Sequence, residues 1–109
     1  MIIIYLFGCF NILKEISMDI TGIQFLEDRT WDGDRKCIVF YAQIGRQKIT
    51  CAVSGSALND YYRSKDTKAK AMENYRNNTK KIHHIAKRLI DDDFFDDNNE
   101  IFISSEELV

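Results

Sequence analysis

Proline is absent from the 109-residue sequence, so neither a proline-stiffened linker nor a cis-prolyl bond constrains the chain. Cysteine is scarce: the three residues are Cys9, Cys37 and Cys51, and they form no CxxC pair. An odd number of cysteines without such a pair is typical of a protein in a reducing compartment. We therefore expect a cytoplasmic protein whose single core forms without disulfide staples.

Motifs of catalysis are missing as well. The sequence has neither a GxSxG nucleophile elbow nor a glycine-rich phosphate loop. Cys51 has no histidine near it in the sequence, and Ser54 and Ser56 lack a partnered His and Asp. We predict that the protein is not an enzyme, that no residue is catalytic, and that Cys51 is a small core residue.

Metal-binding patterns are incomplete. His83 and His84 are adjacent, so they point about 100° apart on a helix and cannot form an i, i+4 pair. The acidic segments 28–34 (DRTWDGD) and 91–100 (DDDFFDDNNE) lack the ligand pattern of an EF-hand loop. We predict no metal site and no cofactor. Both segments are interpreted as solvated turns, and His83 as a boundary residue hydrogen-bonded to a neighbour.

The first part of the sequence differs from the rest. Residues 1–17 are apolar from Ile2 to Phe10, yet they lack the charged start and cleavage site of a signal peptide. They are also shorter than the roughly 20 residues of a membrane helix. We expect residues 1–17 to be an N-terminal extension from a misassigned start, with Met18 as the true start. The alternative is a strand or flap docked on the sheet. Residues 18–109 are expected to form a single small domain.

A β-hairpin is the clearest structural prediction. Apolar residues alternate with a period of two on both sides of Gly45-Arg46. A two-residue loop there places apolar side chains on one shared face, in the pairs Ile38–Val53, Phe40–Cys51 and Ala42–Ile49, with Ile44 opposite Gln47. A shift of the strand pairing by one residue would move these apolar side chains from the core face to the solvent face, so the register is well specified. Glycine at the first loop position favours a type II′ turn.

Shorter signals complete the element order. Ile23 to Leu26 is predicted as a first strand and Asp28 to Asp34 as a turn, with Asp32-Gly33 suited to a positive φ. Asn98-Asn99 indicates another turn, and Ile101 to Ile103 a fourth strand.

Two helices are expected between the hairpin and the last strand. The first runs from Ala57 to about Arg63, with Ser56 as its N-cap. The second runs from about Thr67 to Ile90 and carries one apolar stripe; a break near Ser64 to Thr67 separates them. The prediction is an α+β fold, a four-stranded, mostly antiparallel sheet with two helices packed on one face, in the order β-β-β-α-α-β.

An ordered set of residues carries a family resemblance. These residues are Trp31, Arg35, Val39-Phe40, Ala42, Ile49 to Ser54, Ala57-Leu58, Asp60 to Tyr62, Tyr75-Arg76 and Ile82 to Ile90. Together they resemble the small bacterial family catalogued as domain of unknown function 1488. The resemblance implies a soluble protein with three strands, two helices and a strand. It implies no activity and no catalytic residue, so the family leaves the function open.

The sheet face opposite the predicted core is mixed in character. The simpler interpretation is scattered apolar surface residues. The sharper one is a contact with a protein partner or a second copy of the chain, and we name Trp31, Val39 and Tyr41 as that partner surface. The leading functional hypothesis is accordingly a binding or accessory module that acts through protein–protein contacts and does not associate with membranes.

The second functional hypothesis concerns the helix predicted over residues 67–90. Arg76, Lys80, Lys87 and Arg88 lie off its apolar stripe and could contact the phosphates of a nucleic acid. A solvated surface balanced by the aspartates that follow is the simpler interpretation. The whole chain carries a net charge of −2, which disfavours a nucleic-acid binder that works by bulk charge.

Overall fold

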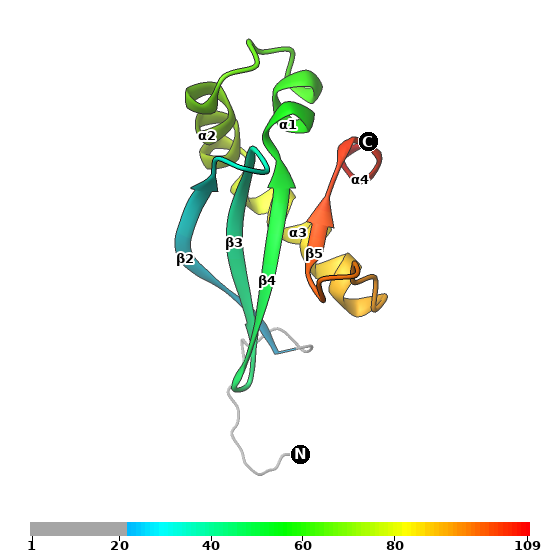
Figure 1. Ribbon diagram of the computed structural model, residues 1–109. Helices are drawn as coiled ribbons and strands as arrows, with labels where there is room; N and C mark the ends of the chain where they lie inside the picture. The colour runs from blue at the N-terminus through cyan, green and yellow to red at the C-terminus, as the bar shows by residue number, and fades with distance from the viewer. Residues whose placement is uncertain (1–21) are drawn as a thin grey trace.

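Four strands form one sheet in the order β2-β3-β4-β5 in the computed structural model, which describes residues 22–109 (Figure 1). They are β2 (Ile23–Asp32), β3 (Cys37–Ile44), β4 (Gln47–Ser54) and β5 (Ile101–Ile103). The pairs β2–β3 and β3–β4 are antiparallel, and β4–β5 is parallel. The predicted α+β class with a four-stranded, mostly antiparallel sheet is confirmed. The prediction for residues 1–17 lies outside the described residues.

The hairpin has the predicted register. Phe40 pairs with Cys51 and Ile44 with Gln47 around the Gly45-Arg46 loop. Gly45 has a φ of 58°, whereas Arg46 is not among the residues with positive φ, as expected for a type II′ turn. The register places Cys37 and Cys51 on opposite faces of β3–β4, and both cysteines are free and buried.

Strand β2 is longer than predicted. It continues through the segment expected to be a turn, up to Asp32, because a bulge absorbs extra residues between Phe25 and Arg29. The positive φ expected near Asp32-Gly33 occurs instead at Lys36, with a φ of 54°. The error arose because polar residues on an edge strand give no alternating apolar signal.

Helix α1 (Gly55–Tyr61) begins earlier than predicted, at Gly55 and not at Ala57. Ser54, not Ser56, is the N-cap, and its Oγ accepts a hydrogen bond from the Ala57 amide at 3.1 Å. Strand β4 therefore passes into the helix without a loop. The Ser56 hydroxyl donates to the carboxylate of Asp66.

The expected long helix is two helices, α2 (Lys68–Asn77) and α3 (Thr79–Asp91). The break falls at Asn78, which leaves helical geometry with a φ of −129° and a ψ of 28°. Its side-chain amide donates to the Asn74 carbonyl, and the Thr79 hydroxyl donates to the carbonyls of Tyr75 and Arg76. Such side-chain bonds compete with the backbone ladder, so they explain the interruption. Thr67 caps α2: its Oγ1 accepts a hydrogen bond from the Lys70 amide.

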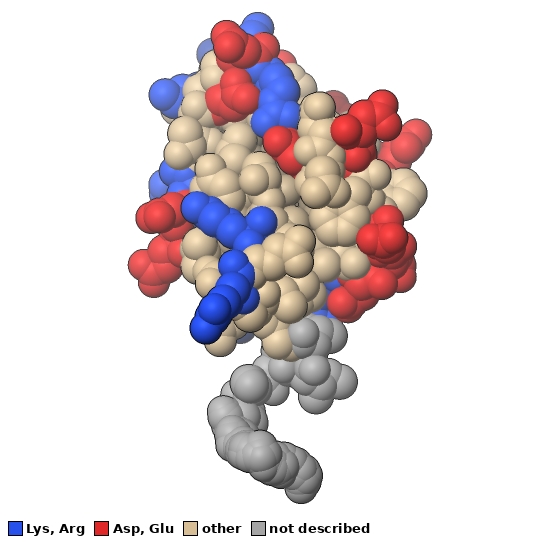
Figure 2. Space-filling model, turned by 60° about the horizontal axis from the view of Figure 1, so that its bottom comes forward, with Lys and Arg blue, Asp and Glu red and all other residues tan. Residues whose placement is uncertain are grey.

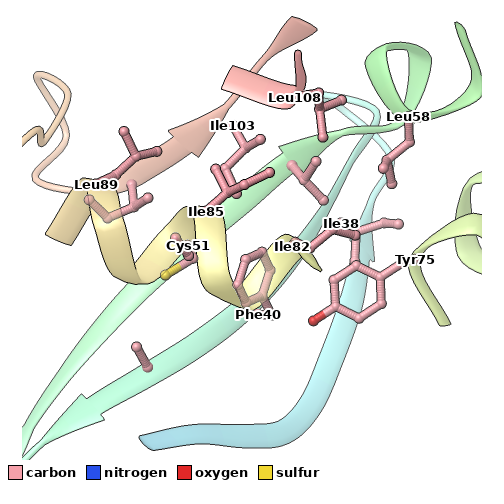
Figure 3. Packing of buried hydrophobic residues seen from close by; sticks show 14 of the residues in the cluster. Ile38, Phe40, Cys51, Leu58, Tyr75, Ile82, Ile85, Leu89, Ile103 and Leu108 are labelled. Atoms are coloured by element: carbon pink, nitrogen blue, oxygen red, sulfur yellow. The ribbon is translucent and has the colours of Figure 1, made fainter. Parts of the chain in front are cut away.

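The hydrophobic core lies between one sheet face and α3. Figure 3 shows Ile82, Ile85 and Leu89 of α3 directed toward Phe40 and Cys51 of the sheet. In Figure 1 α3 passes behind the sheet, while α1 and α2 stand at one end of it. The buried layer predicted from the apolar stripe is therefore confirmed.

The chain ends in an element that was not predicted. Helix α4 (Ser105–Leu108) follows β5 directly, and Ser104 and Glu107 form a capping box at its start. Leu108 is buried in the core (Figure 3). None of the helices between residues 22 and 109 is both long and apolar enough to cross a membrane.

Candidate functional site

The sheet face opposite α3 carries a half-buried apolar group. Val39 pairs with Ala52, which pairs in turn with Phe102, and Tyr41 pairs with Thr50 in the next row. We call Val39, Tyr41 and Phe102 the outer face; each is partly exposed. The Lys48 ammonium group lies 4.3 Å from the centroid of the Tyr41 ring, a cation–π distance. Two of the predicted partner residues, Val39 and Tyr41, are thus neighbours on this face.

Trp31, the third predicted partner residue, lies elsewhere. It pairs with Ile38, whose side chain is in the core, so Trp31 points to the α3 side of the sheet. Its ring packs against the start of α1: a Cβ added to Gly55 would stand 2.9 Å from Trp31 Cη2. Trp31 closes one end of the core and does not join the outer face.

Arg35, Asp32 and Glu100 form an ionic cluster at one end of the sheet. Arg35 Nε is 2.9 Å from Asp32 Oδ2, and its Nη1 is 3.2 Å from Glu100 Oε1. Hydrogen bonds from the Arg35 side chain and backbone lower the pKa of the Asp32 carboxyl. Burial raises the pKa of the nearby Cys37 thiol. Sequence reasoning missed this cluster because Arg35 and Glu100 are 65 positions apart and no local pattern connects them.

The predicted phosphate-contacting residues occupy two helices. Arg76 is on α2, and Lys80, Lys87 and Arg88 are on α3 beyond the break at Asn78. Lys87 Nζ is 3.5 Å from the Asp91 carboxylate. Figure 2 shows another side of the molecule, where basic and acidic side chains are interspersed among uncharged ones. The structure therefore does not join the four residues along one uninterrupted helix face.

A cavity on the other side of the sheet brings together residues that were not predicted to meet. Its volume is about 430 Å³, and its lining comprises Phe25, Leu26, Glu27, Arg29, Tyr75, Thr79 and His83. Tyr75 Oη and His83 Nε2 are 3.1 Å apart, which confirms the expected hydrogen-bonded partner of His83. Burial, followed by the positive charge of Arg29, lowers the pKa of His83.

A second polar cluster fixes the connection between α1 and α2. The Asn59 side chain is 1% exposed; it donates to Asp66 and the Thr67 carbonyl and accepts from Asn74. Because these groups satisfy one another, the cluster is best explained as structural. Within residues 22–109, no three His, Cys, Asp or Glu side chains are grouped so as to hold a metal ion.

Comparison with known sequences decides the family. The family described as "Protein of unknown function (DUF1488)" matches residues 23–103. The chain belongs to the DUF1488 family. The uncharacterized protein YrdB of Escherichia coli K12 is 31% identical over 71 residues, covering 65% of this chain and 82% of YrdB. YrdB of Shigella flexneri has the same identity and coverage.

The DUF1488 fold is also seen in a solved relative. The crystal structure of a DUF1488 protein from Shewanella loihica PV-4 superposes with a TM-score of 0.72 at 26% identity, covering 77% of this chain and 93% of the relative. The DUF1488 match spans β2 to β5, so the outer face and the cavity both lie within it. Each of these relatives is itself described as of unknown function or uncharacterized.

Proposed function

We propose that this DUF1488 protein is a cytoplasmic, non-enzymatic binding module that contacts another protein through the outer face. The observation that carries the proposal is the adjacency of Val39, Tyr41 and Phe102 on the sheet face away from α3. Partly exposed aromatic and aliphatic side chains grouped on one sheet face are typical of the centre of a protein interface.

Binding through the face is favoured over binding through a sheet edge. An exposed edge strand accepts another strand only if its backbone is regular over several residues. At one edge β2 is interrupted by the bulge between Phe25 and Arg29, and at the other β5 has only three residues. Neither edge offers a long regular ladder, whereas the outer face spans the regular antiparallel pair β3–β4.

Charge near Tyr41 indicates the chemistry of the partner. Lys48 lies over the Tyr41 ring, and Arg46 lies at the tip of the same hairpin. At the other end of the sheet Arg35 is already neutralised by Asp32 and Glu100. The unbalanced charge beside the apolar group is therefore positive. The surface fits a partner with an apolar patch rimmed by carboxylates.

The cysteines support a binding role over thiol chemistry. Burial raises the pKa of the Cys51 thiol to about 12, and burial also raises the pKa of Cys37. A reactive cysteine needs a lowered pKa and access to solvent, and both of these side chains are fully buried. Two free buried thiols are also compatible with the reducing compartment that we propose.

A photo-crosslinking amino acid at position 39 tests the proposal in cells of the native host. We expect it to crosslink to one protein, at an apolar surface flanked by Asp or Glu, and Tyr41→Ser in the same chain to abolish most of that product. Tyr61→Ser is the matched control, because Tyr61 is an exposed tyrosine on α1.

Light scattering of the purified chain tells whether the partner of the outer face is a second copy of the chain or a different protein. A dimer that Tyr41→Ser converts to a monomer identifies a second copy of the chain as the partner. A strict monomer whose crosslinking does not change on Tyr41→Ser would contradict the proposal.

Nucleic-acid contact is the alternative, carried by the exposed side chains of Lys80 and Arg88 on α3. It has less support, because Lys87 is paired with Asp91 and Arg76 lies beyond the break. Charge reversal at Lys80 and Lys87 would abolish a salt-dependent mobility shift with DNA or RNA. Absence of any shift at low salt would dismiss this alternative.

A further inference from the structure

The bulge in β2 changes which residues of β3 its side chains meet. Phe25 pairs with Ala42 and Arg29 with Phe40, so three residues of β2 stand opposite the single residue Tyr41. Bulges re-aim side chains and are common beside functional sites. Here the two extra residues leave Arg29 on the helix side of the sheet and place it opposite Phe40, next to Tyr75 of α2.

The bulge, α2 and α3 together line the cavity of about 430 Å³, which is open to solvent on one side. This volume lies within the range of small-molecule sites, roughly 300–1,000 Å³. Its walls combine the apolar side chains of Phe25 and Leu26 with the polar groups of Arg29, Tyr75 and His83. The cavity opens on the helix side of the sheet, so it is separate from the outer face.

Arg29 is the cation of the cavity. Its guanidinium carbon lies 5.5 Å from the centroid of the Tyr75 ring, a cation–π distance. The Arg29 side chain is exposed, so its forked N–H donors can reach a guest in the cavity. The ion pairs found among residues 22–109 do not include Arg29. Glu27 also lines the cavity and is the one acidic side chain in the lining, so it opposes an anionic guest.

His83 and Tyr75 form a fixed, neutral wall. The His83 ring stacks on Phe25 at 4.2 Å, and its Nε2 is hydrogen-bonded to the Tyr75 hydroxyl. Figure 3 shows the Tyr75 ring beside Phe40, and the two centroids are 5.5 Å apart. Burial raises the pKa of the Tyr75 hydroxyl, which therefore keeps its proton near neutral pH.

We propose that this cavity binds a small ligand that carries an oxyanion, a carboxylate or a phosphate, on a short apolar body. Arg29 holds the oxyanion through its forked N–H groups. Phe25 and Leu26 pack against the apolar body, and the Tyr75–His83 pair sets the depth of the site. This inference is independent of the partner proposed for the outer face.

Benzoate, phenyl phosphate and inorganic phosphate are suitable probes. We expect benzoate or phenyl phosphate to shift the imidazole NMR signals of His83 saturably and to leave those of His84, which is exposed on α3, unchanged. The relative affinity of the first two probes tells a carboxylate ligand from a phosphate ligand. Inorganic phosphate should bind more weakly than phenyl phosphate because it lacks the apolar body.

Two substitutions that remove opposite charges from the cavity make the test more specific. Arg29→Gln should weaken binding about tenfold or more, as expected for loss of a charge-assisted hydrogen bond, whereas Glu27→Gln should tighten it. Arg76→Gln and Glu106→Gln are the matched controls, since they change net charge equally on exposed helix positions outside the cavity. Arg29→Lys, which keeps the charge and loses the fork, should give an intermediate affinity.

Two results would overturn the inference. One is the absence of any saturable shift of His83 at millimolar probe. The other is an equal loss of affinity in Arg29→Gln and Arg76→Gln, which would mean that only the net charge of the molecule attracts the probe. An unchanged spectral dispersion of the free variants verifies that each remains folded.

Discussion

At the scale of single residues, Trp31 limits what can stand at the start of α1. A Cβ on Gly55 would lie 2.9 Å from Trp31 Cη2 and 3.0 Å from the Lys36 carbonyl oxygen, closer than such atoms normally approach. The backbone oxygen cannot move freely, because it accepts a hydrogen bond from the Gly55 amide. Glycine is required here by close packing and not by a positive φ, since Gly55 is not among the glycines with positive φ.

Gly55→Ala should therefore destabilise the protein by about 1–3 kcal/mol, the usual cost of overpacking. Gly33→Ala is the control, because its added Cβ would meet Trp31 only at 3.9 Å. Urea unfolding of both variants measures the difference. Equal stability of Gly55→Ala and the parent protein would show that the Trp31 ring is not held as described.

His83 predicts a pH dependence of stability. Its folded pKa is lowered from the ordinary value of 6.5, chiefly by burial, so the unfolded chain binds this proton more readily. The stabilisation by neutral His83 is present above pH 6.5 and is lost as the pH falls through the lowered folded pKa. Between about pH 7.5 and 5.5 we expect the parent protein to lose stability and His83→Gln to lose less.

His84→Gln is the matched control, because His84 is exposed and adjacent in the sequence. Urea midpoints at several pH values provide the measurement. If His83→Gln and His84→Gln change the pH profile equally, burial of His83 does not drive the effect.

At the scale of elements, the junction between β4 and α1 depends on one serine. Ser54 caps α1 through the Ala57 amide, whereas Ser56 bonds only to the exposed Asp66. Ser54→Ala should cost about 1 kcal/mol, within the usual range for an N-cap. Ser56→Ala should cost less than about 0.5 kcal/mol, as for most surface changes. Chemical denaturation compares the two; a larger loss from Ser56→Ala would contradict the assignment of the cap.

The break between α2 and α3 also determines how two residues of the cavity lie relative to each other. Asn78 interrupts the helix one turn after Tyr75 and just before the turn that carries His83. The interruption lets Tyr75 and His83, eight residues apart, lie within hydrogen-bond distance. The apolar stripe predicted both helical halves correctly. Periodicity cannot reveal a break at a single residue when the apolar positions on its two sides still follow nearly the same helical spacing.

At the scale of the whole molecule, both described cysteines are enclosed by elements distant in sequence. Cys51 is covered by α3, and Cys37 lies on the opposite side near the Arg35 cluster. Their thiols are fully buried and have raised pKa values. Access to either thiol therefore requires at least a local opening of the fold.

In a Cys9→Ser variant, used so that only Cys37 and Cys51 report, thiol modification by an aromatic disulfide reagent should follow global unfolding. We expect negligible reaction in native buffer and rapid reaction of both thiols above the urea midpoint. Reaction of one thiol well below the midpoint would reveal a separate local opening of that face.

The sequence alone determined the hairpin, its register, the core stripe and the family, because these depend on side-chain periodicity that neighbouring residues express. Tertiary structure alone decided three things: the side of the sheet that Trp31 takes, the Arg35–Glu100 ion pair, and the meeting of Arg29 with Tyr75 and His83. Each depends on a bulge or on pairing between distant segments. Such features bring side chains of different segments together and leave no periodic trace in the chain.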